Sequence, residues 1–175
     1  MVFNEGWGQH NTVEIVNKVI KYDDTRLING VTGWTDRGVG DMYDVHNYPV
    51  TSMILPENNG NRISVLGEFG GYGWAIKEHI WNPNMRNWGY KNIDGAMALI
   101  DSYGRLVYDL ETLIAQGLSA AVYTQTTDVE GEVNGLITYD RKVTKIPEGL
   151  LHLMHNRLYL SLIHISEPTR LRRIS

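Results

Sequence analysis

The sequence predicts an α/β protein in which a parallel sheet is covered by helices. Short apolar runs alternate along the chain with segments of helical periodicity, which is typical of repeated β-α units. Of the 175 residues, 42% are hydrophobic and 21% are charged, as in an ordinary globular domain. This composition excludes a fibrous or a disordered chain.

The first half of the chain is predicted to hold three strands and one helix. Residues 2–3 begin the first strand, residues 26–31 form the second, and residues 43–48 form the third, which ends before Pro49. Asn11 is a suitable N-cap for a helix between the first two strands. Its apolar side chains recur at helical spacing and are Val13, Val16 and Ile20. The Gly-rich residues 33–41 are expected to be irregular.

The second half is predicted to hold two strands, at residues 63–66 and 120–125, with one long helix between them. A loop at residues 72–92 precedes the helix and carries several large aromatic side chains, and loops of this length are usually functional. The helix is the clearest element, because its apolar side chains keep one face and Gly117 lies where a C-cap belongs. The face consists of Ile100, Tyr103, Val107, Leu110 and Ile114.

The charge and the residue types narrow the possible partners. A formal net charge of −4 argues against a nucleic-acid partner, which favours a basic patch. No stretch approaches the roughly 20 apolar residues of a membrane helix, so no membrane partner is expected. The absence of Cys excludes a thiolate nucleophile, a disulfide framework and a thiolate zinc site. The compartment and the oligomeric state stay open.

Two short segments each place a Glu at the C-terminal end of a predicted strand, directly before Gly-containing loop sequence. Glu5 lies in Asn-Glu-Gly-Trp-Gly-Gln, and Glu68 lies in Gly-Glu-Phe-Gly-Gly. Parallel α/β sheets form their active sites at this edge. Glycoside hydrolysis needs two carboxylates, one to attack or to activate water and one to protonate the leaving oxygen. Each Glu alone is more often a loop charge or a helix cap, but the pair on separate strands suits a glycosidase.

Four segments of the chain resemble glycoside hydrolase family 2, and together they cover about residues 1–147. They occur in the family's order and look like its acid/base segment at the fourth barrel strand, its sixth-strand segment, its nucleophile segment at the seventh strand, and its eighth-strand segment with the following loop. The segments are residues 4–9, 44–49, 65–71 and 121–136. The resemblance implies an incomplete (β/α)8 TIM barrel, about strands 4 to 8, within residues 1–160, with no cofactor and no metal.

The resemblance also implies the reaction, a retaining hydrolysis of β-glycosides. Glu5 would be the general acid/base and Glu68 the nucleophile that forms a covalent glycosyl-enzyme, while Asn4 would hold the sugar 2-hydroxyl. The family includes β-galactosidases, β-mannosidases and β-glucuronidases. A β-galactosidase-like activity is the first expectation, although Gly-Glu-Phe-Gly-Gly departs from the Glu-Tyr-Ala-His pattern of the best-known β-galactosidases.

Five further side chains are expected to contact the carbohydrate. Two can hydrogen-bond the substrate or the nucleophile, two can stack on a sugar face, and one can enter the site from the last strand. In that order they are His46 and Tyr48, Trp34 and Trp74, and Gln125. Each also has a structural explanation, in a turn or in the core. Three acidic residues are expected on an exposed loop face, Asp128, Glu130 and Glu132.

Two other interpretations stay open. A metal-dependent hydrolase would use His10, Asp44, His46 and His79, among which Asp44-x-His46 is the nearest to a ligand motif. The second is a catalytically silent fragment or a carbohydrate-binding remnant, because a complete barrel takes about 250 residues. We therefore expect the polypeptide as given to hydrolyse little, and the parent gene product to be the enzyme.

Residues 161–175 are set apart from the rest. They carry three Arg against one Glu and resemble translated adapter sequence at the end of a gene fragment. We expect a non-native or disordered tail here, with a natural basic tail as the alternative.

Overall fold

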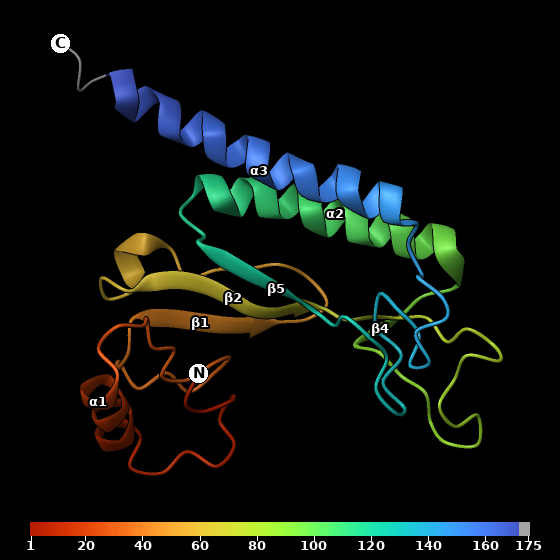
Figure 1. The fold of residues 1–175 in the computed structure, drawn as a ribbon, viewed down its shortest axis with the longest axis horizontal. Coiled ribbons are helices and arrows are strands. Elements are labelled where there is room, and N and C mark those ends of the chain that lie inside the picture. The colour runs from red at the N-terminus through yellow and green to blue at the C-terminus, as the bar shows by residue number, and fades with distance from the viewer. Residues whose placement is uncertain (172–175) are drawn as a thin grey trace. The chain divides into compact units, whose positions relative to one another are not determined.

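A computed structural model describes the chain from residue 1 to residue 171, with side chains described as far as residue 159. It has an α/β fold with a parallel sheet and three helices, as the sequence predicts (Figure 1). The described residues form no closed barrel. Two compact units divide the chain: the first comprises residues 1–47, 52–69 and 116–122, and the second comprises residues 48–51, 70–115 and the chain from Tyr123 onward.

The main sheet has three strands in the order β1-β2-β5. These are β1 (Met42–Asn47), β2 (Ile63–Gly70) and β5 (Ala120–Thr124), which confirms the three strands predicted in these regions. β1 and β2 are parallel. β2 is the central strand and carries the most buried side chains, among them Leu66 at 0% exposure. The C-terminal ends of β1 and β2 therefore lie at one edge of the sheet, where the sequence predicts the active site.

The two strands predicted at residues 2–3 and 26–31 were wrong as regular strands. Only one parallel bridge, Phe3 to Val31, joins these segments. Ile28 instead bonds to Asp41, donating its N–H to the Asp41 carboxylate and accepting from the Asp41 N–H. Because a side chain and a loop satisfy these backbone groups, the ladder does not extend. The bridge nevertheless holds the segment before Glu5 beside residues 29–32.

Helix α1 (Thr12–Tyr22) lies in the first unit, and the predicted N-cap Asn11 precedes it. Only Thr12 and Val16 of this helix are fully buried, and Val13 is 48% exposed, so its apolar face is narrower than the sequence suggests. A short 3-10 turn, η1 (Pro56–Asn58), precedes β2.

Helices α2 (Gly95–Ala115) and α3 (Glu148–Leu171) pack side by side in the second unit (Figure 1). The buried face of α2 confirms the predicted periodicity and consists of Leu99, Tyr103, Leu106, Val107 and Leu110. Tyr103 bonds through its hydroxyl to Nε2 of His155 on α3 at 2.7 Å. The backbone of residues 161–171 belongs to α3, while residues 172–175 of the predicted tail lie outside the described residues.

The loops of the second unit are organised around a buried ion pair. Lys145 donates hydrogen bonds from Nζ to Asp128 Oδ1 at 2.7 Å and to the carbonyls of Trp74 and Val133, both at 2.9 Å. Its side chain is 0% exposed. The prediction that Asp128 lies on an exposed loop face was wrong, because its carboxylate is enclosed with this ammonium group and is only 3% exposed. Glu130 is exposed, as predicted.

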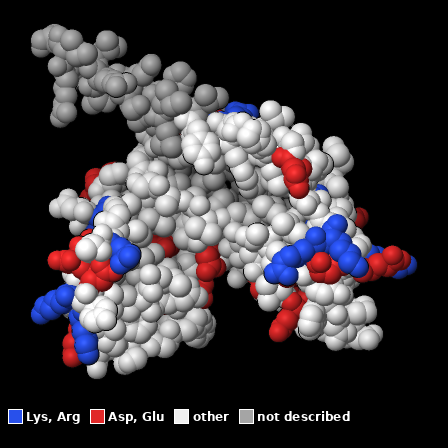
Figure 2. All heavy atoms as spheres, in the orientation of Figure 1, with Lys and Arg blue, Asp and Glu red and all other residues white. Residues whose placement is uncertain are grey.

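Two two-residue strands, β3 (Tyr72–Gly73) and β4 (Lys91–Asn92), pair in parallel at the ends of the predicted long loop. Within the described part of the chain, no helix is long and apolar enough to cross a membrane. On the face drawn in Figure 2, Lys and Arg side chains lie beside Asp and Glu in mixed groups.

Candidate active site

A β-bulge in β2 sets the direction of the candidate nucleophile. Val45 pairs with Leu66, but the next residue of β1, His46, pairs with Glu68. Gly67 is therefore the extra residue on β2. Bulges re-aim side chains and are common beside active sites. Here the bulge brings Glu68 level with His46 at the C-terminal end of the two strands.

Asp44 holds the bulge in place from the neighbouring strand. Its Oδ1 accepts the Gly67 N–H at 2.9 Å, and its Oδ2 accepts the Asn29 side-chain amide at 2.6 Å. The carboxylate is 2% exposed. Burial raises the pKa of Asp44, and the Asn29 hydrogen bond, the charge of His46 and the Gly67 hydrogen bond act in the opposite direction. Asp44 thus links three segments of the first unit, which are its own strand β1, the segment of Asn29 and the bulge of β2.

Replacing Gly67 with Ala is expected to destabilise the protein by about 1–3 kcal/mol, the usual effect of overpacking a filled site. A Cβ at this position would overlap the Asp44 carboxylate, which two hydrogen bonds hold in place. Urea unfolding measures the change. The matched control is Gly149→Ala, because a Cβ there meets no atom within 4 Å in the first turn of α3. Equal stability of Gly67→Ala and wild type would contradict the role of the bulge.

Glu5 is positioned by its own backbone. Its φ of 55° lies in the left-handed region, which non-Gly residues seldom adopt and which is enriched at functional sites. The Glu5 N–H donates to Thr32 Oγ1 at 3.1 Å, and the Glu5 carbonyl accepts from Gln9 Nε2 at 3.1 Å. The Thr32 hydroxyl donates in turn to Asn4 Oδ1 at 2.7 Å. These bonds fix the main chain from which the carboxylate projects.

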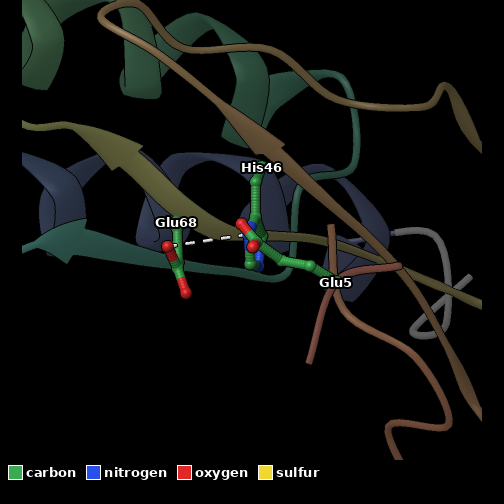
Figure 3. A group of neighbouring side chains, drawn as sticks. All are labelled: Glu5, His46 and Glu68. Carbon is green, nitrogen blue, oxygen red and sulfur yellow. Dashed lines mark hydrogen bonds and ion pairs between the residues drawn. The ribbon is translucent and has the colours of Figure 1, made fainter. Parts of the chain in front are cut away.

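The structure brings Glu5, His46 and Glu68 together (Figure 3). One carboxylate oxygen of each Glu and one ring nitrogen of His46 all lie within 4.8 Å of one another. His46 Nδ1 is 2.9 Å from Glu5 Oε1 and 3.6 Å from Glu68 Oε2. The carboxylates are partly open, at 15% exposure for Glu5 and 31% for Glu68, while the imidazole is 1% exposed. The two carboxylates are accessible to a ligand, whereas the His46 ring that contacts both of them is buried.

The contacts of His46 favour a proton on Nδ1. Nδ1 faces two carboxylates, so a proton on this nitrogen makes the shorter contact, to Glu5, a hydrogen bond. Nε2 is buried and has no hydrogen-bond partner among the described residues, and it lies 3.9 Å from Asp44 Oδ1. A proton on Nδ1 is therefore the one that these contacts require. In this form His46 donates to Glu5 and stands between the two carboxylates.

Two further predicted residues lie near the carboxylate pair. Trp34 packs edge-on against the His46 ring, with 6.2 Å between centroids, and is 46% exposed. Asn4 is exposed and accepts the Thr32 hydroxyl. Gly33 permits close packing here, because its φ is 76° and a Cβ would come within 3.0 Å of the His46 ring. The first unit therefore gathers five of the eight predicted site residues.

The other three predicted residues belong to the second unit. Tyr48 stacks on Tyr90 with 3.6 Å between centroids, and its hydroxyl lies 3.2 Å from Thr124 Oγ1. Gln125 is bonded to Asn134 through its side chain at 2.8 Å and through its backbone. Trp74 is half-buried, and its carbonyl accepts from Lys145. Tyr48 and Gln125 thus have side-chain contacts of their own within this unit.

The sequence did not reveal the residues that position the two carboxylates. Asp44 was considered only as a metal ligand, and the bulge at Gly67 gives no signal in an apolar run. Trp7 was also missed, although its Nε1 donates to Glu5 Oε2 at 3.1 Å and its ring is 74% exposed. The available signal was its place between Gly6 and Gly8, directly after the candidate acid.

The same three side chains are the described residues that can hold a metal ion, since each offers one ligand atom. Two members of the His-rich set considered from the sequence have other partners. His10 bonds through Nδ1 to the carbonyl of Gly8 at 3.0 Å, and His79 pairs through Nδ1 with Asp140 at 2.8 Å. The Thr138 hydroxyl bond and the His79 contact lower the pKa of Asp140 to about 2, although partial burial opposes them.

Neither a scan against models of protein families nor a search of curated proteins found a match to this chain.

Proposed function

We propose that this chain carries the catalytic carboxylates of a retaining β-glycosidase, with Glu68 as nucleophile and Glu5 as general acid/base. Glu68 attacks the anomeric carbon while the protonated Glu5 gives its proton to the leaving oxygen. Glu5 then takes a proton from water as the water oxygen attacks the same carbon and displaces Glu68. The resemblance to glycoside hydrolase family 2 suggests a β-galactosidase-like substrate first, or a β-mannoside or β-glucuronide.

The observation that carries the proposal is the proximity of the two carboxylates. Oxygens of Glu5 and Glu68 lie within 4.8 Å of each other, although the residues come from separate segments. Retaining enzymes place their carboxyl groups about 5–5.5 Å apart, whereas inverting enzymes leave about 6.5–9.5 Å for a water molecule. Oxygens this close are compatible with the retaining arrangement, and they support direct attack by a carboxylate in the first step.

The assignment of the observed strands to a (β/α)8 barrel is part of the same proposal. The Phe3–Val31 bridge and strands β1, β2 and β5 would be the fourth to eighth strands of a (β/α)8 barrel, with Glu5 and Glu68 at the C-terminal ends of the fourth and seventh. Residues Ala120 to Val122 of β5 are exposed at the edge of the sheet, as expected where a further strand pairs. The catalytic unit would then be longer than these residues.

The test is covalent trapping in the full-length protein. A glycosyl fluoride with fluorine in place of the 2-hydroxyl forms the glycosyl-enzyme quickly and releases it slowly, so that the labelled residue can be identified by peptide mapping. We expect one label per chain, on Glu68, and none in Glu68→Gln. Galactosyl, mannosyl and glucuronyl reagents are compared, because the sugar is part of the proposal. A label on another residue, or no label with any reagent while the protein hydrolyses aryl glycosides, contradicts the mechanism.

A metal-dependent hydrolase is the second candidate, since Glu5, His46 and Glu68 also form a group of possible ligands. The two candidates differ under chelation. The carboxylate mechanism predicts unchanged turnover of nitrophenyl β-glycosides after dialysis against EDTA, whereas a metal mechanism predicts loss of turnover and its return on addition of Zn²⁺ or Mn²⁺.

A further inference from the structure

We propose that Trp7 forms the platform for the leaving-group sugar and that it moves from Glu5 onto this sugar when the ligand binds. This inference rests on the proposed function. It assigns a residue to the side of the site where the bond-breaking proton is delivered, and it names the ligand class as a saccharide rather than an aryl or alkyl alcohol.

Two neighbouring side chains hold the carboxylate of Glu5. Both of its carboxylate oxygens are in contact with nitrogen atoms, Oε1 with His46 Nδ1 at 2.9 Å and Oε2 with Trp7 Nε1 at 3.1 Å. An indole N–H only donates, so Oε2 accepts in this conformation. Each oxygen keeps a second lone pair, but a glycosidic oxygen or an acceptor hydroxyl that reaches Glu5 must share the oxygen with one of these nitrogen donors. Withdrawal of one donor would free that oxygen for proton exchange with a substrate.

Burial decides which donor withdraws. The His46 side chain is 1% exposed and is enclosed by Trp34 and Gly33, whereas Trp7 is 74% exposed. On the C-terminal side of Trp7, Gly8 has a φ of 70° and open space at its Cβ position, whereas Gly6 on the N-terminal side packs against Trp34. The backbone of Glu5 is pinned by Thr32 and Gln9 and stays in place. Trp7 is the donor that can leave without disturbing the carboxylates.

The chemistry of the indole indicates what it then contacts. A large exposed aromatic ring beside a polar site has an apolar face and a polar edge, which suits a pyranose with apolar C–H faces and hydroxyl edges. The ring adjoins Glu5, which contacts the leaving group, rather than Glu68, which bonds to the anomeric carbon. Trp7 would thus bind the sugar on the leaving-group side, and the Nε1–H would be released to one of its hydroxyls.

The test uses the trapped glycosyl-enzyme of the full-length protein. An acceptor sugar, here methyl β-glucoside or methyl β-galactoside, binds on the leaving-group side and speeds release of the trapped sugar. Its hydroxyl oxygen bonds to the anomeric carbon, its proton passes to Glu5, and the bond to Glu68 breaks with its electron pair on the Glu68 oxygen. We expect Trp7→Ala to reduce acceleration by the acceptor, measured as the ratio of the release rates with and without acceptor, about tenfold. Trp7→Phe keeps the ring and should retain most of the acceleration.

The control is Trp81→Ala, which removes another exposed indole, 60% exposed and packed on Tyr139, and should behave as wild type. Labelling of Glu68 in each variant shows that the site is intact. Unchanged acceleration in Trp7→Ala overturns the assignment of Trp7 alone, and so does an equal loss in Trp7→Phe, because the ring would then not be the platform. Failure to label Glu68 in wild type overturns the proposed function and this inference with it.

Discussion

Glu5→Ala is expected to slow hydrolysis of β-glycosides with poor leaving groups by roughly 10² to 10⁴-fold, the usual contribution of a positioned general acid. Dinitrophenyl β-glycosides should still form the glycosyl-enzyme at nearly the wild-type rate, because their leaving group departs without a proton. The later attack by water also needs Glu5, so the intermediate should accumulate. The measurement is kcat/KM for both substrate types, with a pre-steady-state burst for the dinitrophenyl glycoside.

Azide gives this prediction a second readout. A small anion in the space of the missing carboxylate can attack the glycosyl-enzyme without base assistance, and two displacements give a β-glycosyl azide. The matched control is Glu14→Ala, an exposed acidic residue of α1 in the same compact unit, which should leave both rates unchanged. Equal losses on both substrate types, with no azide product, would mean that Glu5 is not the acid/base.

Lys145→Met is expected to destabilise the protein by about 3–5 kcal/mol, because it leaves a buried carboxylate without its ion-pair partner. Lys145 donates to Asp128 and to two carbonyls, and both charged groups are at most 3% exposed. Burial raises the pKa of Asp128 and lowers that of Lys145, and their attraction opposes both shifts. Urea unfolding measures the loss, with the exposed Lys142→Met as the matched control.

The pH dependence of this loss has a definite sign. Without Lys145, the pKa of Asp128 in the folded state should rise further, because the opposing interaction is gone. A group with a raised folded pKa stabilises the protein below its unfolded pKa, and this contribution is lost as pH rises through the folded pKa. The difference between Lys145→Met and wild type should therefore be smaller near pH ~4 than near pH ~7. A second change, Asp128→Asn, should recover part of the loss at neutral pH, and no recovery would contradict the account.

The sequence predicted the regular elements whose signals are local. The apolar face of α2 repeats at helical spacing, and the runs in β1, β2 and β5 are bounded by polar or Gly-rich sequence, so each was found near its observed bounds. Residues 26–31 have the same apolar character, but Asp41 satisfies the backbone groups of Ile28 and no ladder forms. Competition from a side chain distant in sequence is not visible in a local pattern.

The sequence predicted which residue types form the candidate site. It did not predict the side chains that hold them in place. Glu5, Glu68 and His46 were identified from their positions after strands, and they lie together. The second unit holds Tyr48, Trp74 and Gln125, which have hydrogen bonds or stacking partners of their own there. Asp128 was misplaced on the surface because a charge in a loop sequence is normally solvated, and only the fold supplies the ammonium group that compensates for its burial.

By itself, therefore, the sequence determined the α/β class, the order of the main strands and helices, and the two carboxylates at strand ends. These features depend on periodicity and on residue type, which local physical chemistry fixes. The tertiary structure decided the distance between the carboxylates, the bulge at Gly67 that turns Glu68 toward His46, and the contact of Trp7 with Glu5. Register, burial and hydrogen-bond partners depend on which segments meet in space.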